Sequence, residues 1–347
     1  MGAIPCPFAI AQLNDRRIFV CHFFITKMSK KRNASIFLLF IVAIVWGFGY
    51  MITDIALQAS HAPSLINLIR FCLASILFGL IFFKKIKLTK TGLTWGTLCG
   101  VLLFLGFALQ TEGLRHTTIS NNAFFTSSNI LFVPFIVWVF FKQKPSWVTL
   151  VGVAVAICGL LILNFGASLT TLDDAIESQY FWGNFLSLLS AFAFGCHMVM
   201  TSFCLRNKGI DNVQITFVEL ASTAVCFLIF FLFTDCSEQV LTQIDWSQFG
   251  WTVLFLAVLN TAFAYTGQIY AQQFVEPNKV SLILCTESML GAIIPVLFGL
   301  EEFGWQMAVG GALVVLAIIL VEYVSQVIAK KNEKQEDVFN EYDQTIE

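Results

Sequence analysis

Ten apolar windows, each about as long as a membrane-spanning helix, follow one another along this chain. A helix needs about 20 apolar residues to cross the hydrocarbon core of a bilayer. Lipid offers no partners to backbone N–H and C=O groups, and no window alternates in the way of a membrane β-strand. The pattern therefore predicts an all-α membrane protein with about ten transmembrane helices. The windows lie at 34–57, 62–83, 93–113, 118–141, 147–165, 179–203, 213–234, 248–270, 277–300 and 304–326.

The composition agrees with a chain that has lipid as part of its solvent. Charged residues make up 12% of the 347 residues, whereas a typical globular domain has about 25%. A net charge of −2 leaves no basic face for a nucleic-acid partner. The ten cysteines are scattered, mostly inside apolar windows, and form no CxxC pair or zinc-like cluster. We therefore expect no metal site and no cofactor.

Basic residues gather in alternate connectors, which indicates the orientation of the chain. With the N-terminus inside, the cytoplasmic segments read "KMSKKRN", "KKIKLTK", "KQK", "LRNK" and "EPNK". The outside segments read "LDDAIESQ", "DCSEQVLTQIDWSQ" and "LEE", and Arg115 is the one basic residue placed outside. We expect a multi-pass protein of the plasma membrane with both termini in the cytoplasm.

The two ends of the chain lie outside the ten windows. Residues 1–33 hold apolar stretches that are too short to span a membrane, and they lack a clean signal-peptide cleavage site. We expect translation to start at Met28, which puts the basic segment "MSKKRN" directly before the first span. Residues 327–347 are polar and are expected to form a cytoplasmic tail.

The two halves of the chain resemble each other weakly. Three segments recur in the same order: 45–51 at 191–198, 73–83 at 220–231, and 146–163 at 304–321. This predicts two five-helix repeats, at 34–165 and 179–326, joined by an external linker at 166–178. Because five is odd, the second repeat must enter the membrane with the opposite orientation. In secondary transporters, such inverted repeats enclose a substrate site near the midplane.

Several motifs resemble those of one family of carriers. They read "WGFGY" in the first span, "RF" at 70–71, "GLRHTTISNNAFFTSSNILFVPF" at 113–135, and "PNKVSLILCTES" followed by "GLEE" within 277–302. Together they resemble the drug/metabolite transporter superfamily, and within it the EamA-type ten-helix permeases. The resemblance spans about 34–326 and implies transport, most often outward, with the fourth span beside a central cavity. In two places the chain departs from the family: Ser288 follows Glu287 where Pro is common, and "KQKP" replaces a Gly-Glu pair after the fourth span.

Four polar residues form a stripe along the fourth span. At roughly 100° per residue they fall within about 80° of one another. A polar stripe that faced lipid would be costly, so we expect it to face other helices or a cavity. Singly, each residue is best interpreted as a bond between helices, worth about 0.6 kcal/mol. Because the resemblance puts this span beside the cavity, we interpret the four together as the lining of a substrate path, which Pro134 helps to shape by kinking the helix. They are Thr118, Asn122, Thr126 and Asn129.

Three charged residues inside predicted spans are further candidates. Glu287 lies near the midplane of its window, where a charge costs about 2.5 to 3.5 kcal/mol, so we weigh a proton-coupling carboxylate equally with a protonated Glu bonded to a neighbouring helix. Arg70 and Asp54 lie at similar depth in a predicted hairpin, where we expect an ion pair. Its role is either to hold the hairpin together or to place Arg70 against an anionic solute.

The remaining candidates have weaker cases. Glu219, six residues into the seventh span, either extends to water or belongs to the pathway. Trp46 is assigned to the pathway through its indole N–H, although packing beside Gly47 and Gly49 is the simpler explanation. His197 is given a low rank, because a lone buried His is more often hydrogen-bonded than functional.

The leading functional hypothesis is a secondary transporter that exports a small metabolite by alternating access. No GxxxxGK[ST] motif indicates an ATP site, so a solute or proton gradient would drive it. The first alternative is a membrane-embedded enzyme, but no HExxH or GxSxG motif supports catalysis. The second is a nucleotide-sugar or sugar-phosphate exchanger, which would require several buried cations where only Arg70 is available. The sequence leaves open the solute, the coupling ion and the formation of a homodimer.

Overall fold

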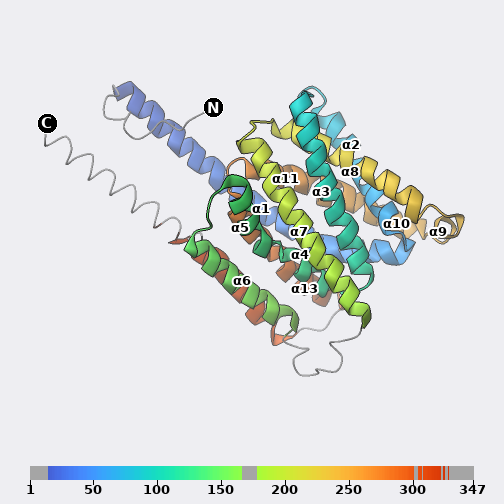
Figure 1. Cartoon of the computed structure of the whole chain (residues 1–347). Helices are drawn as coiled ribbons and strands as arrows, with labels where there is room; N and C mark the ends of the chain where they lie inside the picture. The colour runs from blue at the N-terminus through green and yellow to red at the C-terminus, as the bar shows by residue number, and fades with distance from the viewer. Residues whose placement is uncertain are drawn as a thin grey trace.

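The computed structural model describes residues 15–165, 178–300, 304–306, 308–321, 323, 324 and 327. Within these ranges the chain consists of helices and connections and contains no strand (Figure 1), which confirms the prediction of an all-α fold. In the described part of the chain, eight helical segments are long and apolar enough to cross a membrane, and two apolar helices, Trp147–Ile162 and Ala308–Val321, are shorter. Each predicted window overlaps one of these ten segments over most of its length.

The helices in the first half follow the predicted windows closely. α1 (Asp15–Ser60) begins well before the window at 34–57, and its apolar spanning part is Lys30–Ser60. Residues 1–14, which form part of the predicted N-terminal extension, lie outside the described residues. Most of the predicted polar tail at 327–347 also lies outside them. The other helices of this half are α2 (Pro63–Phe82), α3 (Lys90–Arg115), α4 (Ile119–Ser127), α5 (Asn129–Phe141) and α6 (Trp147–Phe165).

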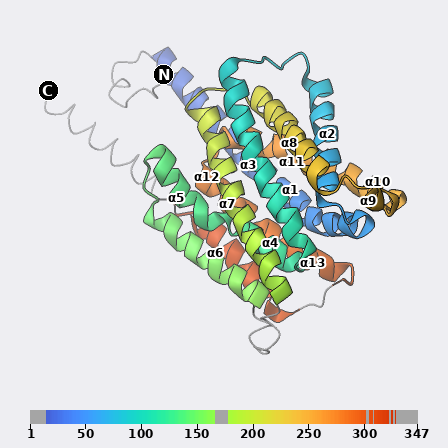
Figure 2. The same cartoon turned by 45° about the vertical axis from the view of Figure 1, so that its right-hand side comes forward.

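The second half begins with two long, unbroken helices. Its elements are α7 (Ser178–Arg206), α8 (Asn212–Thr234), the short α9 (Glu238–Thr242), α10 (Trp246–Phe255), the π-helix η4 (Leu256–Phe263), α11 (Ala264–Gln272), α12 (Pro277–Leu284) and α13 (Thr286–Leu297). Figures 1 and 2 show α3, α7 and α8 packed side by side, with α6 at one flank of the bundle. The apolar helix Ala308–Val321 packs against α6.

Three of the spans are interrupted near their middle. The fourth span breaks between α4 and α5 at Ser128, and the ninth breaks between α12 and α13 at Cys285. The break in the fourth span is therefore not at Pro134, which lies inside α5. The eighth span contains the π-helix η4, a wider turn that is frequent at functional sites. Broken helices at corresponding positions of two halves mark the binding site in many transporters.

Gly183 of α7 allows the close approach of α7 to the end of α3. A Cβ on Gly183 would lie 2.6 Å from the carbonyl carbon of His116 and 2.8 Å from the backbone oxygen of Gly113. These atoms belong to the backbone and cannot rotate away, so a side chain would force the two helices apart.

Replacing Gly183 with Leu is therefore expected to lower the free energy of unfolding by about 3 kcal/mol or more, the upper end of the range for overpacking. The thermal midpoint of the purified protein in detergent measures the loss of stability. Size-exclusion chromatography checks that each variant is folded and not aggregated. Gly250 on α10 provides the control, because nothing lies within 4 Å of a Cβ added there. Equal midpoints for Gly183→Leu and Gly250→Leu would contradict this account of the contact between α3 and α7.

Candidate functional site

A cavity lies at the centre of the helix bundle and is lined by side chains from both halves of the chain. It encloses about 620 Å³ between its lining atoms, counting the part that is open toward solvent. Within it, about 60 Å³ can hold the centre of a water-sized molecule, so the cavity is tight in this conformation. The wall is built from α1, α2, α3, α4 and α5 in the first half and from α7, η4, α11 and α13 in the second. The predicted pathway residues in this wall are Trp46, Arg70, Asn122, Thr126, Asn129 and Glu287.

Thr118 is the predicted pathway residue that does not line this cavity. The helix of the fourth span begins only at Ile119, so Thr118 precedes it and caps it. Its hydroxyl accepts a hydrogen bond from the backbone N–H of Asn121 at 3.2 Å, and its side chain is exposed. The polar stripe is therefore shorter than predicted, because the helical wheel was extended past the true start of the helix.

Two of the remaining stripe residues, Asn122 and Thr126, both join helices and face the cavity. Asn122 donates from Nδ2 to the backbone oxygen of Gln110 at 3.0 Å and to Ser187 Oγ at 2.7 Å. Thr126 Oγ1 lies 3.4 Å from Ser190 Oγ on α7. The two interpretations of the stripe, as bonds between helices and as a cavity wall, are thus compatible in the same residues.

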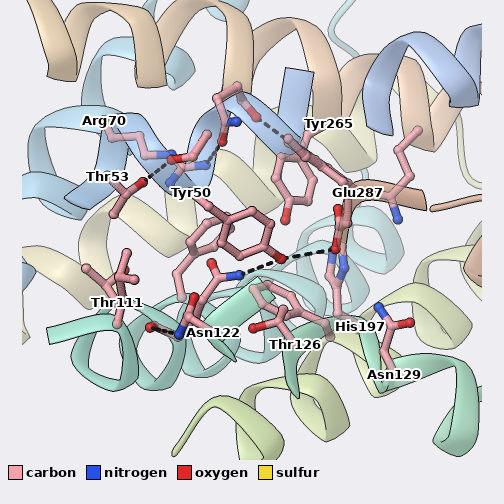
Figure 3. A pocket seen from close by; sticks show the side chains of 18 of the residues that line it. Tyr50, Thr53, Arg70, Thr111, Asn122, Thr126, Asn129, His197, Tyr265 and Glu287 are labelled. Carbon is pink, nitrogen blue, oxygen red and sulfur yellow. Dashed lines mark hydrogen bonds between the residues drawn. The ribbon is translucent and has the colours of Figure 1, made fainter. Parts of the chain in front are cut away.

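Glu287 is the buried acid of the cavity wall and is held by two hydroxyl groups. Its Oε1 accepts from Tyr50 Oη at 3.2 Å (Figure 3). It also accepts from Ser127 Oγ at 3.3 Å, and Glu287 is 6% exposed. Gln110 Nε2 in turn lies 3.4 Å from the Tyr50 hydroxyl. Glu287 is therefore linked to α1 and α4 while it remains at the cavity surface.

Arg70 lies fully inside the bundle and points toward the π-helix of the eighth span. Its Nε donates to Thr261 Oγ1 and its Nη2 donates to Asn260 Oδ1, and its Cζ lies 4.2 Å from the ring centroid of Phe107. The predicted ion pair with Asp54 is wrong, since Asp54 instead accepts from Gln58 Nε2 at 2.7 Å. The sequence places both residues at a similar depth in the hairpin. It does not determine how each helix is rotated about its axis, and this rotation turns the two side chains to different neighbours.

Asn260 is a central residue of the site that the sequence did not single out. Its Nδ2 donates to the backbone oxygen of Val45 at 3.0 Å, and its own backbone oxygen accepts from Trp46 Nε1 at 2.9 Å. A side chain on Gly49 would overlap the Asn260 amide, so the glycine is what allows this approach. The sequence feature that could have indicated this residue is the polar pair Asn260 and Thr261 within an otherwise apolar window. A wheel drawn at α-helical spacing misplaces it, because the π-helix changes the rotation per residue.

His197 of α7 and Glu219 of α8 form a buried pair beside the cavity. His197 Nε2 lies 3.3 Å from Glu219 Oε2, and the two residues are 1% and 0% exposed. Glu219 therefore does not extend to water, which excludes one of the two predicted alternatives. His197 lines the cavity from α7, although its predicted rank was low. The sequence gave no sign of this pair, because its members lie on different helices.

The chemistry of the cavity suits binding. Aromatic rings form part of its wall, with the centroids of Trp46 and Tyr265 5.1 Å apart and those of Phe107 and Tyr265 5.9 Å apart. Amide and hydroxyl groups supply directed hydrogen bonds at the same surface, a combination typical of small-molecule sites. Among the described residues, no three His, Cys, Asp or Glu side chains cluster as metal ligands would.

Comparison with known proteins supports a membrane carrier. The chain is 26% identical to an "Uncharacterized transporter" of Archaeoglobus fulgidus over 286 residues, which covers 81% of this chain and 83% of that protein. It is 22% identical to the "Uncharacterized transporter YoaV" of Bacillus subtilis, covering 81% and 91% of the two chains, and 21% identical to the "Biotin transporter" of Escherichia coli, covering 82% and 91%.

A solved protein structure shares the fold, with a TM-score of 0.67 and 11% identity over 85% of this chain and 99% of that one. The sequence model of the EamA-like transporter family matches twice, at residues 33–165 and 181–323. These two matches cover most of the chain and agree with its resemblance to that family in the sequence. The chain therefore belongs to the EamA-like transporter family, and it is a multi-pass membrane transporter.

Proposed function

We propose that this transporter exports a small metabolite across the plasma membrane by alternating access, driven by a solute or proton gradient. The observation that supports the proposal best is the central cavity, which places Arg70 and Glu287 inside the bundle and takes its wall from both halves of the chain. Polar and charged side chains in the membrane interior are costly and are usually functional. No residue arrangement in this wall favours an embedded enzyme, and one cationic residue is too few for a nucleotide-sugar exchanger.

Contacts between the two broken spans suggest how the cavity would open and close. Ser288 Oγ of α13 donates to the backbone oxygen of Ala123 in α4 at 2.8 Å, and the bond between Ser127 and Glu287 joins the same two helices. One helix belongs to each half. If the halves are inverted relative to each other, as the odd number of spans per half predicts, rocking one half against the other would expose the cavity to each side in turn.

Metabolite profiling tests the proposed export. Cells that lack the gene are compared with cells that carry it, and small molecules are measured inside the cells and in the medium. We expect at least one compound to accumulate inside the deletion strain and to fall in the medium, with both changes reversed when the wild-type gene is restored. If no compound changes in either compartment, the proposal of metabolite export is wrong.

Cysteine labelling tests whether water enters the cavity. Gln110 lines the cavity from α3, whereas Leu105 of the same helix is exposed on its outer surface. In a background with the reactive native cysteines replaced by Ser, a small water-soluble thiol reagent is expected to label Gln110→Cys at least about tenfold faster than Leu105→Cys, because thiolates form poorly in lipid. The compound found by profiling should slow the labelling of Gln110→Cys. Equal rates at the two positions would mean that the cavity is closed to water.

A further inference from the structure

Arg70 is a buried cation that has no anionic partner among the described residues. Its side chain is 2% exposed, and no carboxylate in the described part of the chain lies within 4.0 Å of it. Removing an ion from water carries a penalty of several kcal/mol unless a counter-charge and hydrogen bonds compensate for it. The two neutral oxygens of Asn260 and Thr261 compensate for part of this penalty only.

The other buried acids near the cavity are bonded elsewhere. Glu287 accepts from the hydroxyl groups of Tyr50 and Ser127, and Glu219 contacts His197. Neither carboxylate forms a salt bridge with Arg70 in this structure. The described residues thus supply no carboxylate to Arg70, and an anion bound in the cavity would provide the missing counter-charge.

The guanidinium group is already positioned for such a molecule. Two of its nitrogens, Nε and Nη2, are fixed by Thr261 and Asn260 on the π-helix, and Nη1 makes no hydrogen bond to a described residue. The face of the group lies against Phe107. Arginine holds a carboxylate with directed hydrogen bonds, and a guanidinium that is fixed in advance loses little side-chain entropy on binding. Asn260 is itself held by its bond to the Val45 oxygen.

The surroundings of Arg70 indicate the rest of the ligand. Trp46, Phe107, Phe194 and Tyr265 contribute aromatic rings to the same cavity. These rings offer an apolar surface to a ring or short hydrocarbon, whereas a highly hydrated sugar or an oligophosphate would leave polar groups unsatisfied against them.

We propose that Arg70 binds the carboxylate of the transported solute, so that the substrate is a small organic acid with an apolar or aromatic body. This inference rests on the proposed transport function and names its substrate class. Metabolite profiling separates the two. A transported compound that has no acidic group overturns the role of Arg70 and leaves transport intact, whereas the absence of any transported compound overturns transport itself.

A binding experiment on the purified full-length protein tests the inference directly. Benzoate, phenylacetate and indole-3-acetate are compared with their uncharged amides, which have the same ring and nearly the same size. At least one acid is expected to raise the thermal midpoint in a saturable way, while its amide and an equal concentration of chloride do not. The inference is overturned if no acid stabilises the wild type, if the amides stabilise it equally, or if chloride has the same effect as the acids.

Two variants assign the effect to Arg70. Arg70→Gln removes the charge and its charge-assisted hydrogen bonds, and it is expected to weaken binding of the acid by about tenfold or more. Arg70→Lys keeps the charge without the planar fork and is expected to bind with intermediate affinity. Unchanged affinity in Arg70→Gln would overturn the assignment. Because Arg70 also ties α2 to η4, size-exclusion profiles accompany both variants, and the acid–amide comparison in the wild type decides the case if neither variant folds.

Discussion

Replacing Glu287 with Gln is expected to abolish the pH dependence of transport while leaving the protein folded. Glutamine has nearly the same size, and its side-chain oxygen can still accept from Tyr50 and Ser127, which hold Glu287 in the wild type. It cannot carry a proton, so a pH gradient could no longer drive the solute through this site. In proteoliposomes we expect gradient-driven accumulation to fall by at least about tenfold, corresponding to about 1.4 kcal/mol or more of lost driving force. Exchange of labelled for unlabelled solute without a gradient should continue.

Glu112 provides a matched control for this experiment. It lies on α3 in a partly exposed position, where it contacts Arg115 at 3.7 Å and His116 at 3.0 Å. Glu112→Gln should keep the pH dependence of the wild type. If Glu287→Gln also keeps it, Glu287 is not the coupling group. A loss in Glu219→Gln together with an unchanged profile in Glu287→Gln would move that role to the buried pair with His197.

Replacing His197 with Leu is expected to destabilise the protein by about 3 to 5 kcal/mol, the usual cost of removing one partner of a buried pair. The change leaves the fully buried Glu219 without its contact at 3.3 Å, and the other oxygen, Oε1, already lacks a hydrogen-bond partner among the described residues. Adding Glu219→Gln should recover most of the loss, because a neutral amide is far less costly to bury than a carboxylate. Thermal midpoints of the two single variants and the double variant give the coupling between the residues.

A second His–Glu contact in the chain supplies the comparison. His116 and Glu112 are 3.0 Å apart on the same helix, but both side chains are more than one-third exposed. Water screens this pair, so His116→Leu is expected to cost only about 0 to 1 kcal/mol. If His197→Leu lowers the free energy of unfolding no more than His116→Leu does, the buried contact between His197 and Glu219 does not contribute more to stability than the exposed one.

Hydropathy predicted the spans well because each span depends on local chemistry. A segment of about 20 apolar residues must become helical in lipid wherever its neighbours lie. The same argument predicted that Asn122, Thr126 and Glu287 would turn away from lipid, and all three line the central cavity. Thr118 does not line this cavity, because it precedes the first residue of α4, and helix ends are less certain than helix interiors from sequence alone.

The partners of the buried charges depended on the tertiary structure. Depth along a helix can be counted from the sequence, but the rotation of one helix against another is set by packing. Arg70 therefore meets Asn260 and Thr261 of η4 rather than Asp54, and Glu219 meets His197 rather than water. The π-helix adds to the difficulty, since it shifts the register of every residue that follows it.

The sequence by itself determined that this protein is a bundle of membrane-spanning helices with polar side chains at its centre, because the cost of polar groups in lipid acts on each segment separately. Only the tertiary structure decided which of these side chains meet across helices, and that Arg70 remains without a carboxylate among the described residues. Contacts between helices arise from close packing of side chains distant in the chain, and no local pattern contains that information.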